Sequence, residues 1–159
     1  MFHLEMTGDW NKAGLYLRNL AVRLYPEFSM KFYESGEFVL EKMKGHIFNQ
    51  DLGWTPLSPH TIELKNGDST ILIETGQLAN GLTVRRVKSS AYGDTLFIGA
   101  SPWKKHHSGL GLDELMIMHE YGTSNMPARP LIRPTIEEVE NELRSMWSKE
   151  FENIIREGL

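Results

Sequence analysis

The chain has 159 residues, a net charge of −4 and no cysteine. This length is enough for one well-filled hydrophobic core and too short for two comfortable domains, and the missing cysteine excludes disulfides, thiol catalysis and thiolate metal sites. The charge lacks the basic excess of a dedicated nucleic-acid binder, and no apolar run reaches the ~20 residues that span a bilayer. The length therefore predicts one domain over residues 1–159. Residues 1–8 lack the features of a signal peptide, so we expect the protein to be made and assembled in a cytoplasm.

Residues 2–47 predict a short strand followed by a long helix. Alternating apolar residues from Phe2 to Met6 favour a strand, and Asp9 is placed to cap the helix that follows. Pro26 disfavours helical geometry at the residue before it, so we expect the helix to kink or restart there. Apolar residues at steps of three and four predict one core-facing stripe, formed by Trp10, Ala13, Leu17, Leu20, Ala21 and Leu24 and continued by Phe28, Phe32, Val39, Met43 and Ile47.

The middle of the chain predicts turns, two short helical turns and a hairpin. Glycine, proline, asparagine and aspartate dominate after residue 49, and helical turns are expected at residues 60–64 and 75–80. Two strand-like runs follow at residues 82–87 and 95–99, with a turn containing Tyr92-Gly93-Asp94 between them. Their spacing predicts an antiparallel hairpin.

The last third of the chain predicts an exposed loop and two helices. Residues 100–111 are polar and glycine-bearing, which is typical of a mobile surface loop, and residues 113–121 predict a short helix that ends at Gly122. Thr135 and Glu138 have the spacing of a capping box at the start of the final helix, whose apolar stripe is Ile136, Val139, Leu143, Trp147, Phe151 and Ile154. We therefore predict an α+β fold, with a small, mainly antiparallel sheet packed against long N-terminal and C-terminal helices.

Catalytic motifs are incomplete in this sequence. His119-Glu120 begins like the zinc-binding helix motif, but Thr123 stands where the second histidine is required. The adjacent His106 and His107 would point apart on regular structure, although a loop could bring them together with His119 and Asp113. We expect solvated loop histidines and one helix histidine, with no catalytic residue, no cofactor and no metal. The alternative from a different class is a small metal-dependent hydrolase that uses His119, Glu120 and the loop histidines.

Residues 126–131 form a stiff, extended segment because two prolines stand three positions apart. Pro127 and Pro130 each fix their own φ and bias the preceding residue toward extended geometry. Arg129 lies between them as a pre-oriented bidentate donor. Two interpretations remain open at this point. Arg129 either engages an acceptor on another subunit, or it bonds internally to carbonyls or a carboxylate.

Several short segments resemble one family when they are taken in order. Residues 54–61 (Trp54-Thr55-Pro56-Leu57-Ser58-Pro59-His60-Thr61) resemble the tryptophan, Pro-Leu-Ser-Pro and threonine pattern of tailed-bacteriophage virion morphogenesis proteins. Residues 71–78, which contain Thr75-Gly76-Gln77-Leu78, are similar to the next segment of that family. Residues 120–131 and the acidic final helix resemble the close of the related neck and tail-completion proteins. Departures are Leu131, where the family usually has Phe, and Asn80-Gly81, where a serine is common.

The resemblance implies a structural protein without enzymatic activity. Proteins of this family finish the head-proximal end of the tail and help to join it to the head, as a ring that is expected to be hexameric. The implied partners are copies of the chain itself, tail-tube or terminator proteins and head-connector proteins, and DNA passes through the ring without specific binding. A tail terminator or a head-closure component is the alternative within the class. The candidate interface and motif residues are Trp54, Pro56, Leu57, Thr75, Gly76, Leu78, Tyr121, Gly122, Pro127, Arg129, Pro130 and Leu131.

Overall fold

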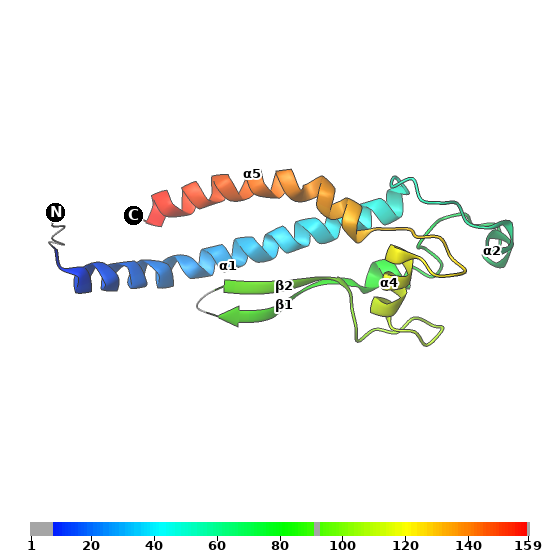
Figure 1. The fold of residues 1–159 in the computed structure, drawn as a ribbon, viewed down its shortest axis with the longest axis horizontal. Coiled ribbons are helices and arrows are strands. Elements are labelled where there is room, and N and C mark those ends of the chain that lie inside the picture. Colours follow the sequence, from blue (N-terminus) through cyan, green and yellow to red (C-terminus); the bar gives the residue numbers. More distant parts are fainter. Residues whose placement is uncertain (1–7, 91–92, 159) are drawn as a thin grey trace, which may run out of the picture.

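The structure is a computed structural model that describes residues 8–90 and 93–158, so the strand predicted at residues 2–6 and the centre of the hairpin turn lie outside the described residues. The elements in chain order are α1 (Trp10–Asn49), α2 (Pro59–Leu64), α3 (Gln77–Gly81), β1 (Leu82–Ser90), β2 (Gly93–Ala100), α4 (Leu112–Tyr121) and α5 (Ile132–Gly158). The long α1 lies between α5 and the β1–β2 hairpin (Figure 1). The predicted α+β fold with long terminal helices is confirmed.

The helix α1 runs without interruption for 40 residues, about 60 Å at 1.5 Å per residue. Asp9 caps it as predicted, because its side chain accepts a hydrogen bond from the backbone N–H of Lys12. The helix does not restart at Pro26. Tertiary contacts hold this turn in place, since the hydroxyls of Tyr25 and Ser29 donate to the carboxylate of Asp94 on β2 at 2.7 and 2.5 Å.

The first half of α1 corrects the predicted core-facing stripe. Of its six residues from Trp10 to Leu24, only Leu24 is buried, while Trp10 and Leu17 are 60% and 62% exposed. The blue end of α1 projects past the hairpin and past the end of α5 (Figure 1), so nothing in the described chain covers it. We call residues 10–23 the arm. The second half of the stripe is confirmed, because Val39, Met43 and Ile47 belong to the core.

The hairpin packs directly on α1, and Gly36 makes this close approach possible. β1 and β2 pair antiparallel as predicted, with Leu82 opposite Ala100 and Ser90 opposite Gly93. A Cβ atom on Gly36 would lie 2.9 Å from a methyl carbon of Leu96 and 3.0 Å from one of Val84. A larger side chain would therefore separate the hairpin from the helix.

The short helices and the helix stop at Gly122 agree with the sequence, but the start of α5 does not. The helix begins at Ile132, and Thr135 lies inside it, fully buried, with its hydroxyl donating to the carbonyl of Leu131 at 2.6 Å. The carboxylate of Glu138 pairs with Lys42 on α1 at 3.0 Å. The predicted capping box at Thr135 and Glu138 is therefore wrong, and another group must satisfy the first N–H groups of α5.

An aromatic cluster joins α5 to α1. The ring of Trp147 stacks on the ring of Phe28 at a centroid distance of 6.3 Å, and the centroid of Phe151 lies 5.8 Å from that of Phe28. Val139 and Ile154 are buried as predicted, whereas Ile136 and Phe151 are exposed at the surface. Within residues 8–90 and 93–158, no helix combines the length and apolar character that crossing a membrane requires.

Candidate functional site

Residues from two of the segments that resemble the family, 54–56 and 129–130, contact each other, and we call this contact the clasp. The indole N–H of Trp54 donates to the carbonyl of Pro130 at 2.7 Å. The guanidinium of Arg129 donates to the carbonyls of Thr55 and Pro56 at 3.0 and 3.2 Å. Only 5% of Arg129 is exposed. Of the two interpretations of Arg129, the geometry therefore supports the internal brace, and burial leaves it no surface for a partner.

The other motif residues divide between the interior and the surface. Leu78 and Leu131 belong to the hydrophobic core, and Leu57 packs against it. Gly122 ends α4 with φ 74°, and a Cβ there would lie 2.8 Å from the backbone nitrogen of Ala128. Gly76 has φ 72° at the start of α3. The motif residues that are exposed, and so available to another chain, are Pro56, Thr75, Tyr121 and Pro127.

Glu120 supplies the missing cap of α5. Its carboxylate, only 8% exposed, accepts hydrogen bonds from the backbone N–H groups of Leu131, Ile132 and Arg133 at 2.7, 2.9 and 3.0 Å. These three bonds make the side chain of Glu120 the N-terminal cap of α5. With all three bonds made, Glu120 is not placed to act as the general base of a hydrolase.

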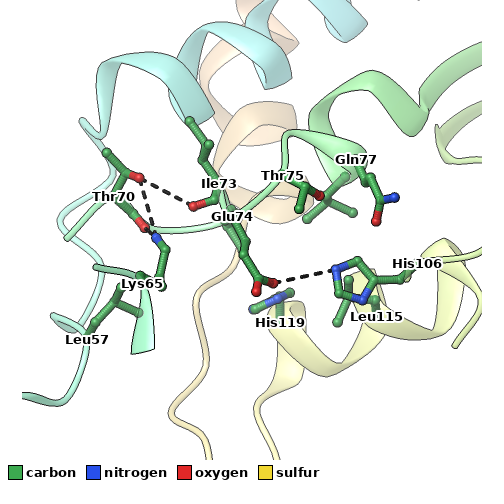
Figure 2. Close-up of a pocket in the computed structure, with 12 residues that line it drawn as sticks. Leu57, Lys65, Thr70, Ile73, Glu74, Thr75, Gln77, His106, Leu115 and His119 are labelled. Atoms are coloured by element: carbon green, nitrogen blue, oxygen red, sulfur yellow. Dashed lines mark hydrogen bonds and ion pairs between the residues drawn. The ribbon is translucent and has the colours of Figure 1, made fainter. Parts of the chain in front are cut away.

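His119, the neighbour of Glu120, lines a cavity of about 150 Å³ (Figure 2). Burial, followed by the positive charge of Arg129 and the proximity of His106, lowers the pKa of His119 to about 4. The imidazole is therefore neutral at pH 7, and its Nδ1 has no hydrogen-bond partner among the described residues. The apolar part of the lining is Leu57, Leu72, Ile73, Leu78 and Leu115.

The two adjacent histidines of the 100–111 loop come together at the rim of this cavity, on Glu74. The Nε2 atoms of His106 and His107 lie 3.7 and 3.9 Å from the two carboxylate oxygens of Glu74. The rings do not point apart, because the chain forms a tight turn closed by a bridge between Lys105 and Gly111 rather than regular structure. The ligand atoms of Glu74, His106 and His107 all lie within 4.8 Å of one another.

The metal arrangement considered from the sequence is thus replaced by a different set of donors. His119 and Asp113 do not belong to the group of potential ligands that the described residues form, and Glu74 does. The sequence analysis missed Glu74 because it lies 32 positions before His106, outside any helical or turn spacing that would relate the two. Only the packing of the segment before α3 against the loop brings them together (Figure 2).

Two further surfaces have complementary chemistry. The arm exposes Trp10, Leu15, Tyr16, Leu17 and Val22, together with three basic residues and no acidic residue. α5 contains seven glutamates against four basic residues, and among its exposed residues are Ile136 and Phe151. A basic, apolar surface and an acidic surface with apolar side chains are suited to pair with each other.

No protein-family model, curated protein sequence or solved structure matches this chain.

Proposed function

We propose that this chain is a structural subunit of a tailed-bacteriophage virion, which completes the head-proximal end of the tail and helps to join tail to head as a ring, expected to be hexameric. The observation that carries the proposal is the arm, a helical extension with large apolar side chains and no cover in the described chain. The segments from Trp54 to the final helix resemble, in order, those of tailed-bacteriophage virion morphogenesis proteins, and this resemblance supports the assignment to phage structural proteins. A tail terminator or head-closure component of the same neck region is the alternative within it.

The arm is apolar on opposite sides, which favours assembly over a free surface helix. At 100° per residue, Trp10 and Leu17 lie on one side of α1, and Leu15 and Val22 lie on the other. A helix that is apolar on more than one side is stable in water only when other elements surround it. Each large apolar side chain that becomes fully buried contributes ~1.5–3 kcal/mol, so five of them can offset much of the cost of association.

The occupant we assign to this surface is the α5 helix of a second copy. Lys12, Arg18 and Arg23 give the arm a positive charge, and the exposed glutamates of α5 give the opposite surface a negative one. Because the two surfaces differ, the contact is heterologous, and repeating it leads to a closed ring or to an open helical filament. A ring of subunits with net charge −4 would let DNA pass without gripping it.

Analytical ultracentrifugation of purified protein tests the assembly. We expect the wild-type chain to form a discrete oligomer and the Leu17→Ser/Val22→Ser variant to sediment as a monomer. The matched control is Phe48→Ser, which removes an equally exposed apolar side chain at the other end of the same helix. A wild-type monomer at all concentrations, or an oligomer unaffected by the arm variant, would contradict the proposal.

Gene position tests the biological assignment separately. A structural neck protein is expected to be encoded between the head genes and the tail-tube genes of a phage genome. A gene outside any cluster of virion genes would overturn the phage assignment, even if the protein forms a ring.

A further inference from the structure

We propose that Glu74, His106 and His107 bind one divalent transition-metal ion of the zinc and nickel class, at the rim of the cavity between the 100–111 loop and the segment before α3. The proposal is independent of ring assembly. It rests on three ligand atoms from two segments that are distant in sequence, all within 4.8 Å of one another.

The donor types select the class of ion. Two imidazole nitrogens and one carboxylate oxygen are the ligands of zinc, nickel and copper sites, whereas calcium and magnesium prefer oxygen ligands alone. Three protein ligands leave at least one coordination position for water or for another donor. His119 lines the same cavity, and its Nδ1 has no hydrogen-bond partner among the described residues, although it lies outside the group of three close ligand atoms.

The distances are close to those that one ion imposes. Ligand atoms bound tetrahedrally at ~2.0–2.2 Å from a zinc ion lie roughly 3.3–3.5 Å from one another. The imidazole nitrogens of His106 and His107 are 3.7 and 3.9 Å from the oxygens of Glu74. The three ligand atoms lie within 4.8 Å of one another, so side-chain shifts of up to roughly 1.5 Å would complete the site. The same distances are long for hydrogen bonds, so the group is not already closed as a tight ion pair.

Neighbouring groups orient the ligands before any ion binds. The Nδ1 of His106 lies 2.9 Å from the hydroxyl oxygen of Ser108 and accepts a hydrogen bond from the backbone N–H of Ser108 at 3.3 Å, so Nε2 is the ring nitrogen that faces Glu74. The backbone N–H of His107 donates to the side chain of Gln77 on α3, which ties the loop to the body of the protein. An ion would add a second tie between the same segments. The exposed loop would thus become fixed when metal is present.

Isothermal titration of zinc chloride into untagged, chelator-treated, full-length protein tests the site. We expect one zinc ion per chain, and at least about a tenfold weaker affinity for Glu74→Gln and for His107→Ala. The matched control is His60→Ala, which removes an exposed histidine on α2, outside the cluster, and should bind zinc like the wild-type protein. Glu74 and His107 are about half exposed, so circular dichroism should find both variants folded.

Cobalt(II) gives a second readout, because its visible absorption reports nitrogen and oxygen ligands in a tetrahedral arrangement. The wild-type protein and His60→Ala should show this spectrum, and His107→Ala should lose it. The proposal is overturned if the wild-type chain binds no zinc ion. It is also overturned if Glu74→Gln and His107→Ala both bind zinc as tightly as the control.

Discussion

Arg129 holds together two segments that are more than 70 residues apart. Its guanidinium donates to the carbonyls of Thr55 and Pro56, and its own backbone N–H donates to the carbonyl of His119 at 2.7 Å. The flanking prolines keep this segment extended, so little conformational freedom is lost when the bonds form. The side chain therefore braces the monomer, and its effect should appear in the stability of the subunit.

We expect Arg129→Ala to lower the free energy of unfolding by about 1.5–3 kcal/mol, the range for hydrogen bonds that involve a charged group. Arg129→Lys should recover only part of this loss, because lysine keeps the charge without the planar fork. Urea unfolding followed by circular dichroism measures both. The control is Arg133→Ala, an exposed arginine near the start of α5. A stable Arg129→Ala variant with impaired association would instead support a contact between subunits.

His119 makes the stability of the metal-free protein depend on pH. Its pKa is about 4 in the folded chain, mainly because of burial, and an unfolded chain has the ordinary value near 6.5. Between these two values the unfolded state binds a proton that the folded state does not. The contribution of His119 is therefore present above pH 6.5 and is lost as pH falls toward 4.

We expect His119→Gln to reduce the loss of stability between pH 6.5 and 4. The group contributes at most about 1.4 kcal/mol per pH unit in this window. Urea titrations of both proteins at several pH values, with a chelator present, measure the difference. His60→Gln, at an exposed histidine, should follow the wild-type curve. Parallel curves for His119→Gln and the wild-type protein would mean that His119 takes up its proton normally in the folded state.

The helix α5 begins where a side chain from another helix reaches its first turn. Glu120 at the end of α4 accepts the N–H groups of three successive residues, and Gly122 then turns the chain with φ 74°. The cap of α5 is therefore formed by a contact with a different helix, α4, although the two helices are close in sequence. This geometry also engages Glu120, one of the residues of the hydrolase alternative, in a structural contact.

The hairpin packs on α1 at Gly36, where the helix carries no side chain. Gly36→Leu should lower the free energy of unfolding by about 1–3 kcal/mol, because the new side chain would overlap the methyl groups of Leu96 and Val84. Gly45→Leu on the same helix meets no atom within 4 Å at its Cβ, and its higher helix propensity should stabilise the protein by up to about 1 kcal/mol. Thermal unfolding of the pair measures the contrast. Equal effects of the two substitutions would mean that the hairpin does not rest on Gly36.

The whole molecule is asymmetric, with a basic apolar arm at one end and an acidic helix along one side (Figure 1). If the two surfaces pair between copies, their charges should accelerate association. We expect Arg18→Glu/Arg23→Glu to associate more slowly than the wild-type chain, and added salt to slow only the wild-type chain. Stopped-flow light scattering measures these rates.

The matched control for this pair is Lys104→Glu/Lys105→Glu, which changes the net charge equally on a loop outside both surfaces. Its association rate and salt dependence should remain close to those of the wild-type protein. Equal slowing by both double variants would show that total charge, rather than the arm, controls association.

Local physics made part of this fold predictable from the sequence. Asp9 as a cap, Gly122 as a helix stop and the β1–β2 hairpin were all identified correctly, because each depends on residues within a few positions of one another. The repeating apolar residues also identified the two long helices that dominate the fold.

Other features of the fold depend on contacts between residues that are distant in the chain, and only the tertiary structure reveals them. The periodicity of the sequence shows that the arm carries apolar residues. Only the positions of α5 and the hairpin show that these two elements end before they cover the arm. The spacing of Thr135 and Glu138 fits a capping box with Ile136 as the first helical residue, yet Glu120 accepts the amides of Leu131, Ile132 and Arg133, and the helix begins four residues earlier, at Ile132. Glu74 joins His106 and His107 through packing that no local spacing encodes. Local patterns specify which groups a segment presents, and only packing specifies which groups they meet.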